Sequence, residues 1–103
     1  MATKIIAGIP VEVNDEGYMT NPSQWTKEIA VEIAKEESID LTERHYAVIN
    51  YIRDKVSKGE TLTLRGVGKS GIVDLKELYQ LFPGGPLKKA TKIAGLTKPE
   101  SCI

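Results

Sequence analysis

The chain has 103 residues, of which 41% are hydrophobic and 27% charged, and this length and composition support one globular domain with a modest core. A multidomain enzyme is excluded, and no run of about 18 apolar residues is long enough to cross a bilayer. Basic and acidic side chains cancel at fourteen each, yet residues 1–60 hold seven basic and eleven acidic groups, whereas residues 61–103 hold seven and three. Such a division is often a by-product of solvated helix faces, but it can also steer an acidic protein or an RNA towards the basic half.

The cysteine and histidine counts exclude several kinds of site. Cys102 is the only cysteine, so an internal disulfide is impossible, and one Cys with one His does not make a zinc site. The first residues carry a single lysine and are interrupted by Gly8 and Pro10, which fits neither a signal peptide nor a transit peptide. We expect a cytoplasmic protein without a metal or cofactor.

The first twenty residues predict a β-hairpin with strands near 4–6 and 9–13, followed by a turn cluster at 14–17. A helical body over residues 21–95 comes next. The sequence Asn21-Pro22-Ser23-Gln24 predicts the start of a helix that continues to about residue 37. Trp25 falls on its apolar stripe with Ile29 and Ile33, so we expect the indole in the core.

A second helix is predicted from the cap residue Thr42 to about residue 58, ending at Gly59. His45 lies in its first turn without other ligand-type residues at useful spacing, and we interpret it as a residue at the boundary of the core. Residues 61–71 contain three glycines, which argues against a long regular helix. The Gly-Lys-Ser sequence at 68–70 resembles a phosphate-binding loop but lacks its first glycine, since Thr63 stands there.

A third helix is expected from residue 73 or 74 to 82, with one apolar side made of Leu75, Leu78, Tyr79 and Phe82. Pro83-Gly84-Gly85 ends it, and Pro86 begins another helix that stops before Gly95. Residues 96–103 contain a proline and show no periodicity, so we expect a flexible C-terminal arm.

Cys102 is the penultimate residue of that arm, which favours an accessible thiol over a core position. Nearby lysines should lower its pKa mildly, while Glu100 and the terminal carboxylate oppose the shift. A thiol on an arm suits a carrier that enters a partner's pocket better than a self-contained catalyst, since no general base lies near it in sequence. Six basic residues are candidates for partner binding: Arg65, Lys69, Lys88, Lys89, Lys92 and Lys98.

Residues 78–86, Leu-Tyr-Gln-Leu-Phe-Pro-Gly-Gly-Pro, are followed by Ala-Thr-Lys-Ile-Ala-Gly-Leu at 90–96, Lys98-Pro99 and the penultimate Cys102. This C-terminal pattern resembles the DsrC/TusE family, and looser similarity extends to Gly8-Ile9-Pro10-Val11 and Trp25. The resemblance implies a mainly α fold: a small orthogonal helical bundle with a helix-turn-helix-like centre, an N-terminal β-hairpin and a mobile C-terminal arm. One domain would span residues 1–103.

The resemblance also implies a function that depends on the number of cysteines. Family members that serve dissimilatory sulfite reductase carry a second cysteine eleven positions before the penultimate one, where this chain has Thr91. The one-thiol pattern is similar to members that accept persulfide sulfur and pass it towards 2-thiouridine formation in tRNA, with sulfurtransferases as donor and acceptor. The usual proline before Lys98 is replaced by Thr97. Two alternatives stay open: a gamma-subunit-type partner of the reductase, and a DNA-binding helix-turn-helix module using Arg65 and Lys69.

Overall fold

The N-terminal hairpin consists of strand β1 (Ala2–Ile6) and strand β2 (Ile9–Val13) in the computed structural model, which describes residues 2–97. The strands pair antiparallel in a register that places Ile6 opposite Ile9. Ala7 and Gly8, with φ of 54° and 77°, close the two-residue turn that a twisted hairpin favours. Alternation buries Ile6, Val11 and Val13 on one face, so the hairpin predicted from the sequence is confirmed.

The segment after the hairpin differs from the single helix that we predicted. A 3-10 turn, η1 (Pro22–Gln24), is capped by Asn21, and the chain is extended at Trp25 before helix α1 (Lys27–Glu36) begins. The side chain of Thr26 accepts the Ile29 N–H and so provides a second helix cap directly behind the first. The prediction of one continuous helix was therefore wrong. Trp25 lies outside the helical stripe on which we had placed it, and its side chain is only partly buried against the core rather than within it.

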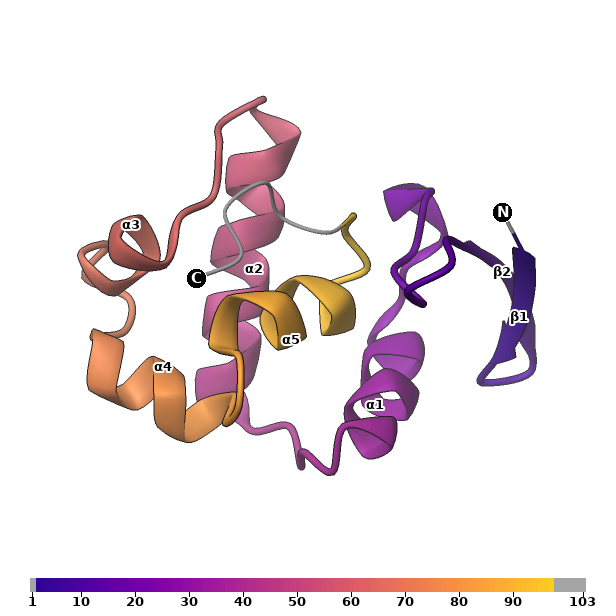
Figure 1. Cartoon of the computed structure of the whole chain (residues 1–103), viewed down its shortest axis with the longest axis horizontal. Coiled ribbons are helices and arrows are strands. Elements are labelled where there is room, and N and C mark those ends of the chain that lie inside the picture. Colours follow the sequence, from indigo (N-terminus) through magenta and orange to yellow (C-terminus); the bar gives the residue numbers. More distant parts are fainter. Residues whose placement is uncertain (1, 98–103) are drawn as a thin grey trace.

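Helix α2 (Glu43–Ser57) runs through the middle of the molecule, and its buried side chains Val48, Ile49 and Ile52 are at most 1% exposed. Lys58 is the cap residue after its last turn, and the next residue, Gly59, has φ of 77°. Figure 1 shows helix α5 (Pro86–Ile93) lying across α2, with α1 between α5 and the hairpin. These contacts confirm the mainly α bundle with an N-terminal hairpin.

Two short helices, α3 (Leu64–Gly68) and α4 (Leu75–Leu81), pack together on the other side of α2. The glycine-rich stretch thus forms a helix of only five residues. Leu78 and Phe82 are fully buried, but Leu75 and Tyr79 are 45% and 47% exposed. The predicted apolar side of four residues was wrong for those two, because α4 is short and only one edge of it faces the core.

Helix α5 begins at Pro86, as predicted, and buries Leu87, Ala90 and Ile93. Leu96 is only 3% exposed, although we had placed it in the flexible arm. That prediction was wrong for Leu96, because the chain turns back at Gly95 and carries the leucine into the core. The thiol of Cys102 and the ammonium group of Lys98 lie outside the described residues. Within residues 2–97 no helix is long and apolar enough to span a membrane.

The core joins all of these elements. Its fully buried larger side chains are Val11, Met19, Ile29, Val48, Ile49, Ile52, Val67, Leu78, Phe82, Leu87, Thr91 and Ile93.

Candidate functional site

The described part of the candidate site is the end of α5, from which the chain continues towards Cys102. The Gly95 N–H donates to the Lys92 carbonyl at 3.2 Å, and the Leu96 N–H donates to the Thr91 carbonyl at 3.0 Å. Gly95 has φ of 72°, the left-handed conformation that glycine adopts without strain. These features form a Schellman motif, which ends the helix and directs Leu96 into the core.

Two side chains from distant parts of the sequence complete this helix end. The indole Nε1 of Trp25 donates to the Ile93 carbonyl at 2.8 Å, and Nη1 of Arg53 donates to the Ala94 carbonyl at 2.6 Å. The Arg53 guanidinium also lies over the Trp25 ring, 4.3 Å from its centroid. We call Trp25 and Arg53 the root clamp, since they hold the end of α5 just before the C-terminal residues begin.

Arg53 binds a third carbonyl, that of Pro22, through Nη2 at 3.2 Å. It therefore ties α2 to both η1 and α5. Desolvation lowers the pKa of Arg53 from its ordinary value, but a guanidinium stays charged in proteins. A cation at the C-terminal end of a helix is also favoured by the helix dipole.

The candidate partner-binding residues lie in two separate places. Lys88, Lys89 and Lys92 project from α5, whereas Arg65 lies in α3 and Lys69 is the cap residue directly after it. The structure therefore does not bring the five described basic residues together in one cluster.

On the α5 side, Lys92 forms an ion pair with Glu37 at 3.3 Å and lies 5.9 Å from the centre of the Tyr18 ring. Lys88, Lys89 and Lys92 line one side of an open crevice of about 230 Å³, which Glu16 and Glu37 also line. The positive charge of this face is thus partly compensated by carboxylates.

Thr91 stands where two-cysteine relatives of the resemblance have their second thiol, and its side chain is fully buried. Its hydroxyl donates to the Leu87 carbonyl at 2.9 Å, one helical turn back. The sequence signalled neither the burial nor this bond, because a threonine directly before Lys92 in a lysine-rich helix looks like a surface residue. A side chain at this position faces the core of the bundle.

We had predicted His45 at the boundary of the core, but its side chain is buried. Its Nδ1 accepts the Thr42 N–H at 3.0 Å, and its Nε2 lies 2.9 Å from the Leu81 carbonyl. Since a carbonyl only accepts, these two partners require the neutral tautomer with hydrogen on Nε2. The ring also packs edge-on against Phe82, with centroids 5.1 Å apart. His45 thus joins α2 to α4, and both of its nitrogens are occupied.

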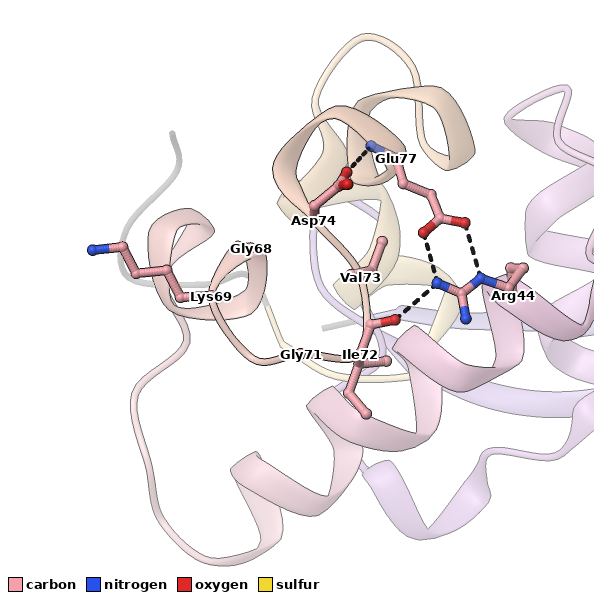
Figure 2. A pocket seen from close by; sticks show the side chains of 8 residues that line it. All are labelled: Arg44, Gly68, Lys69, Gly71, Ile72, Val73, Asp74 and Glu77. Atoms are coloured by element: carbon pink, nitrogen blue, oxygen red, sulfur yellow. Dashed lines mark hydrogen bonds and ion pairs between the residues drawn. The ribbon is translucent and has the colours of Figure 1, made fainter.

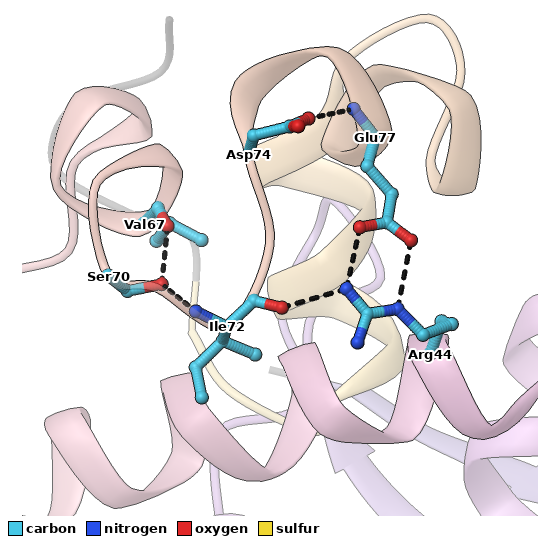
Figure 3. A network of polar contacts seen from close by, with 6 residues as sticks. All are labelled: Arg44, Val67, Ser70, Ile72, Asp74 and Glu77. Atoms are coloured by element: carbon cyan, nitrogen blue, oxygen red, sulfur yellow. Dashed lines mark hydrogen bonds and ion pairs between the residues drawn. The ribbon is translucent and has the colours of Figure 1, made fainter.

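A second polar network fixes the α3–α4 turn on α2. Arg44 donates from Nε and Nη2 to the carboxylate of Glu77, at 2.9 and 2.6 Å, and from Nη2 to the Ile72 carbonyl (Figures 2 and 3). The bond from Arg44 lowers the pKa of Glu77 below its ordinary value. Ser70 bridges the same turn, because its hydroxyl donates to the Val67 carbonyl and accepts the Ile72 N–H (Figure 3).

Beside this network is an open hollow of about 450 Å³, with Gly68 and Gly71 in its lining. Figure 2 shows the Lys69 side chain pointing away from the Arg44–Glu77 pair. Arg44 and Glu77 are thus engaged with each other, and their contacts anchor the α3–α4 turn on α2.

The fold is a helical bundle with an N-terminal hairpin, and the clamped end of its last helix is followed in the sequence by a penultimate cysteine. These two features define the class of protein. The sequence model described as "DsrC like protein" matches residues 5–103, and the chain belongs to this DsrC-like family.

Within this family, the chain is similar over its full length to sulfurtransferases named TusE. The chain is 40% identical to the sulfurtransferase TusE of Photorhabdus laumondii, with all of both chains covered. It is also 40% identical to TusE of Escherichia coli K12, over 96% of this chain and 98% of that one. The TusE homolog of Haemophilus influenzae gives the same identity over 95% and 97%.

Solved structures agree with the fold. DsrC of Allochromatium vinosum superposes with a TM-score of 0.85 at 33% identity, covering 98% of this chain and 97% of that chain. The oxidized gamma-subunit of the dissimilatory sulfite reductase from Archaeoglobus fulgidus gives a TM-score of 0.82 at 31% identity, covering 99% and 100%.

Proposed function

We propose that this protein is a sulfur carrier of the TusE type, which accepts persulfide sulfur on Cys102 and passes it to a partner protein. The observation that carries the proposal is the single, penultimate cysteine in a chain that is 40% identical to sulfurtransferase TusE over its full length. A lone thiol stays reduced in the cytoplasm, and we place the exchange there.

The transfer is a thiolate displacement at sulfur. The Cys102 thiolate attacks the outer sulfur of a donor persulfide, so that one S–S bond forms, one breaks and the donor cysteine leaves as a thiolate. Cys102 then carries the persulfide. No net oxidation or reduction occurs, and the step needs no cofactor.

Release has to be intermolecular because the chain has no second thiol. The sulfur leaves when a partner's thiolate attacks it, or when an external reductant removes it. This distinguishes the carrier from a two-cysteine protein, which resolves its own persulfide. We infer that an acceptor sulfurtransferase, and through it a tRNA-thiolating enzyme, is the physiological outlet.

In this proposal, the candidate basic residues bind the partner protein. Lys88 and Lys89 on α5 lie on the same helix as the root of the segment that carries Cys102, and Lys98 lies within that segment. They would meet acidic groups around a partner's pocket and raise the rate of encounter. Arg65 and Lys69 would contribute through α3.

A second candidate function is that of a gamma-subunit-type partner of dissimilatory sulfite reductase, and the superposition on the gamma-subunit from Archaeoglobus fulgidus favours it. The two functions differ in the pocket that receives Cys102. Buried Thr91 weighs against the two-thiol reaction, because this position supplies no sulfur for an internal link.

Two reaction mixtures test the choice. In one, the reduced protein meets a persulfide-loaded sulfurtransferase and then a tRNA-thiolating enzyme; in the other, it meets sulfite, dissimilatory sulfite reductase and an electron donor. We expect labelled sulfur to reach tRNA in the first mixture and no trisulfide-linked product in the second. Trisulfide turnover in the second, with no transfer in the first, would establish the reductase partner instead.

A further inference from the structure

The carbonyls at the end of α5 have three kinds of partner: the local turn, the Trp25 side chain and the Arg53 side chain. The carbonyls of Thr91 and Lys92 are satisfied by the local turn, and those of Ile93 and Ala94 by the root clamp. The clamp residues are 68 and 41 positions away in sequence from the carbonyls that they bind. The last carbonyls of a helix lack partners within the helix, and here the side chains of Trp25 and Arg53 supply partners for two of them.

The clamp also fixes the direction of the chain beyond the helix. Leu96 is buried while Thr97 is exposed, so the main chain reaches the surface between these two residues. Cys102 follows Thr97 by five residues, and a fully extended chain of that length spans at most about 18 Å. Chain length alone therefore keeps Cys102 within about 18 Å of Thr97.

We propose that Trp25 and Arg53 are positioning residues for sulfur transfer, which act by fixing the point from which the segment bearing Cys102 departs. This proposal rests on the proposed carrier function. Neither residue handles sulfur itself. With the root fixed, docking of the body on a partner brings the thiol to the partner's pocket at a high effective concentration. With the root loosened, the same docking leaves the thiol spread over a larger volume.

The first test measures distances and does not depend on sulfur transfer. One spin label is attached to Cys102 and another to a cysteine replacing exposed Glu43 at the start of α2. We expect Arg53→Met, which keeps the stem but loses both donors, to broaden the distance distribution by about 1.5-fold or more. Trp25→Phe should act in the same direction, and Arg53→Lys should restore part of the loss.

The matched control is Arg44→Met, which removes an arginine that also binds a carbonyl and a second partner, but on the α3–α4 turn. It should leave the distribution unchanged. An unchanged distribution in both Arg53→Met and Trp25→Phe would overturn the proposal, as would equal broadening in Arg44→Met.

The second test separates positioning from thiol chemistry. In transfer from the loaded carrier to an acceptor sulfurtransferase, the clamp variants should lower kcat and leave KM unchanged, because the body still docks and only the thiol is less well placed, so that kcat/KM falls about threefold to tenfold. Reaction of Cys102 with iodoacetamide should keep its wild-type rate, because the thiol itself is unaltered. Unchanged transfer in variants with broadened distances would refute the positioning role. Failure of the wild-type protein to transfer any sulfur would refute the carrier function, and the distance measurement would still decide whether the clamp fixes the root.

Discussion

Gly95 lies so close to the Trp25 side chain that even a methyl group does not fit at Gly95. A Cβ atom built on Gly95 would lie 2.4 Å from Cδ1 of Trp25, and the glycine has φ of 72°. Gly59 has a similar φ of 77° after the end of α2, but a Cβ there would meet no atom within 4 Å. Comparing substitutions at the two glycines therefore separates the stability lost to the left-handed backbone from that lost to the contact with Trp25.

We expect Gly95→Ala to lower the free energy of unfolding by at least about 2 kcal/mol, since a left-handed alanine and a displaced indole both contribute. Gly59→Ala should cost only about 1 kcal/mol, from the backbone alone. Urea unfolding of both variants measures the difference. Equal losses would show that the tight contact with Trp25 is absent.

Helix α1 illustrates how a few residues decide where an element starts. The sequence offers two cap residues, Asn21 and Thr26, and the structure uses both, with an extended residue at Trp25. If the chain continued as one helix, Trp25 would follow the helical stripe. The break instead presents its indole N–H to Ile93 at the end of α5.

Thr26→Ala should therefore destabilise the protein by about 1 kcal/mol, because it removes the cap of a ten-residue helix. Asn21→Ala should cost less, since Asn21 caps a turn of only three residues. Thermal unfolding of the two variants checks the order. The reverse order would indicate that the helix begins at Pro22, as the sequence pattern alone predicts.

The ion pair between Arg44 on α2 and Glu77 on α4 makes the stability of the protein depend on pH. Arg44 lowers the pKa of Glu77, so the pair contributes stability above the unfolded-state pKa of glutamate and loses it as the pH falls through the lower folded-state pKa. Glu77→Gln should be less stable than wild type at pH 7, and the difference should shrink below about pH 4.3. Asp40→Asn, at an exposed position between α1 and α2, serves as control. A difference between Glu77→Gln and wild type that did not change with pH would contradict this account.

At the scale of the whole molecule, the sequence predicted the hairpin and four of the helices, whereas the role of Cys102 as carrier thiol stays a prediction. Local signals sufficed there: strand alternation at residues 9–13, the helix start at Thr42, and proline at Pro86. The root clamp was not predictable, because Trp25, Arg53 and Gly95 come from three distant segments and nothing in their spacing indicates that they meet. The burial of Thr91 and Leu96 depends on the same tertiary packing.

The central claim is that Cys102 alone carries sulfur for this protein. Intact mass after incubation with a persulfide-loaded sulfurtransferase tests it most directly, compared with Cys102→Ser and with Ser101→Ala as a neighbouring control. Wild type and Ser101→Ala should gain about 32 Da, one sulfur atom, and lose it again with a thiol reductant, while Cys102→Ser gains nothing. A wild-type protein that takes up no sulfur, or a Cys102→Ser protein that gains the same reducible mass, would contradict the account.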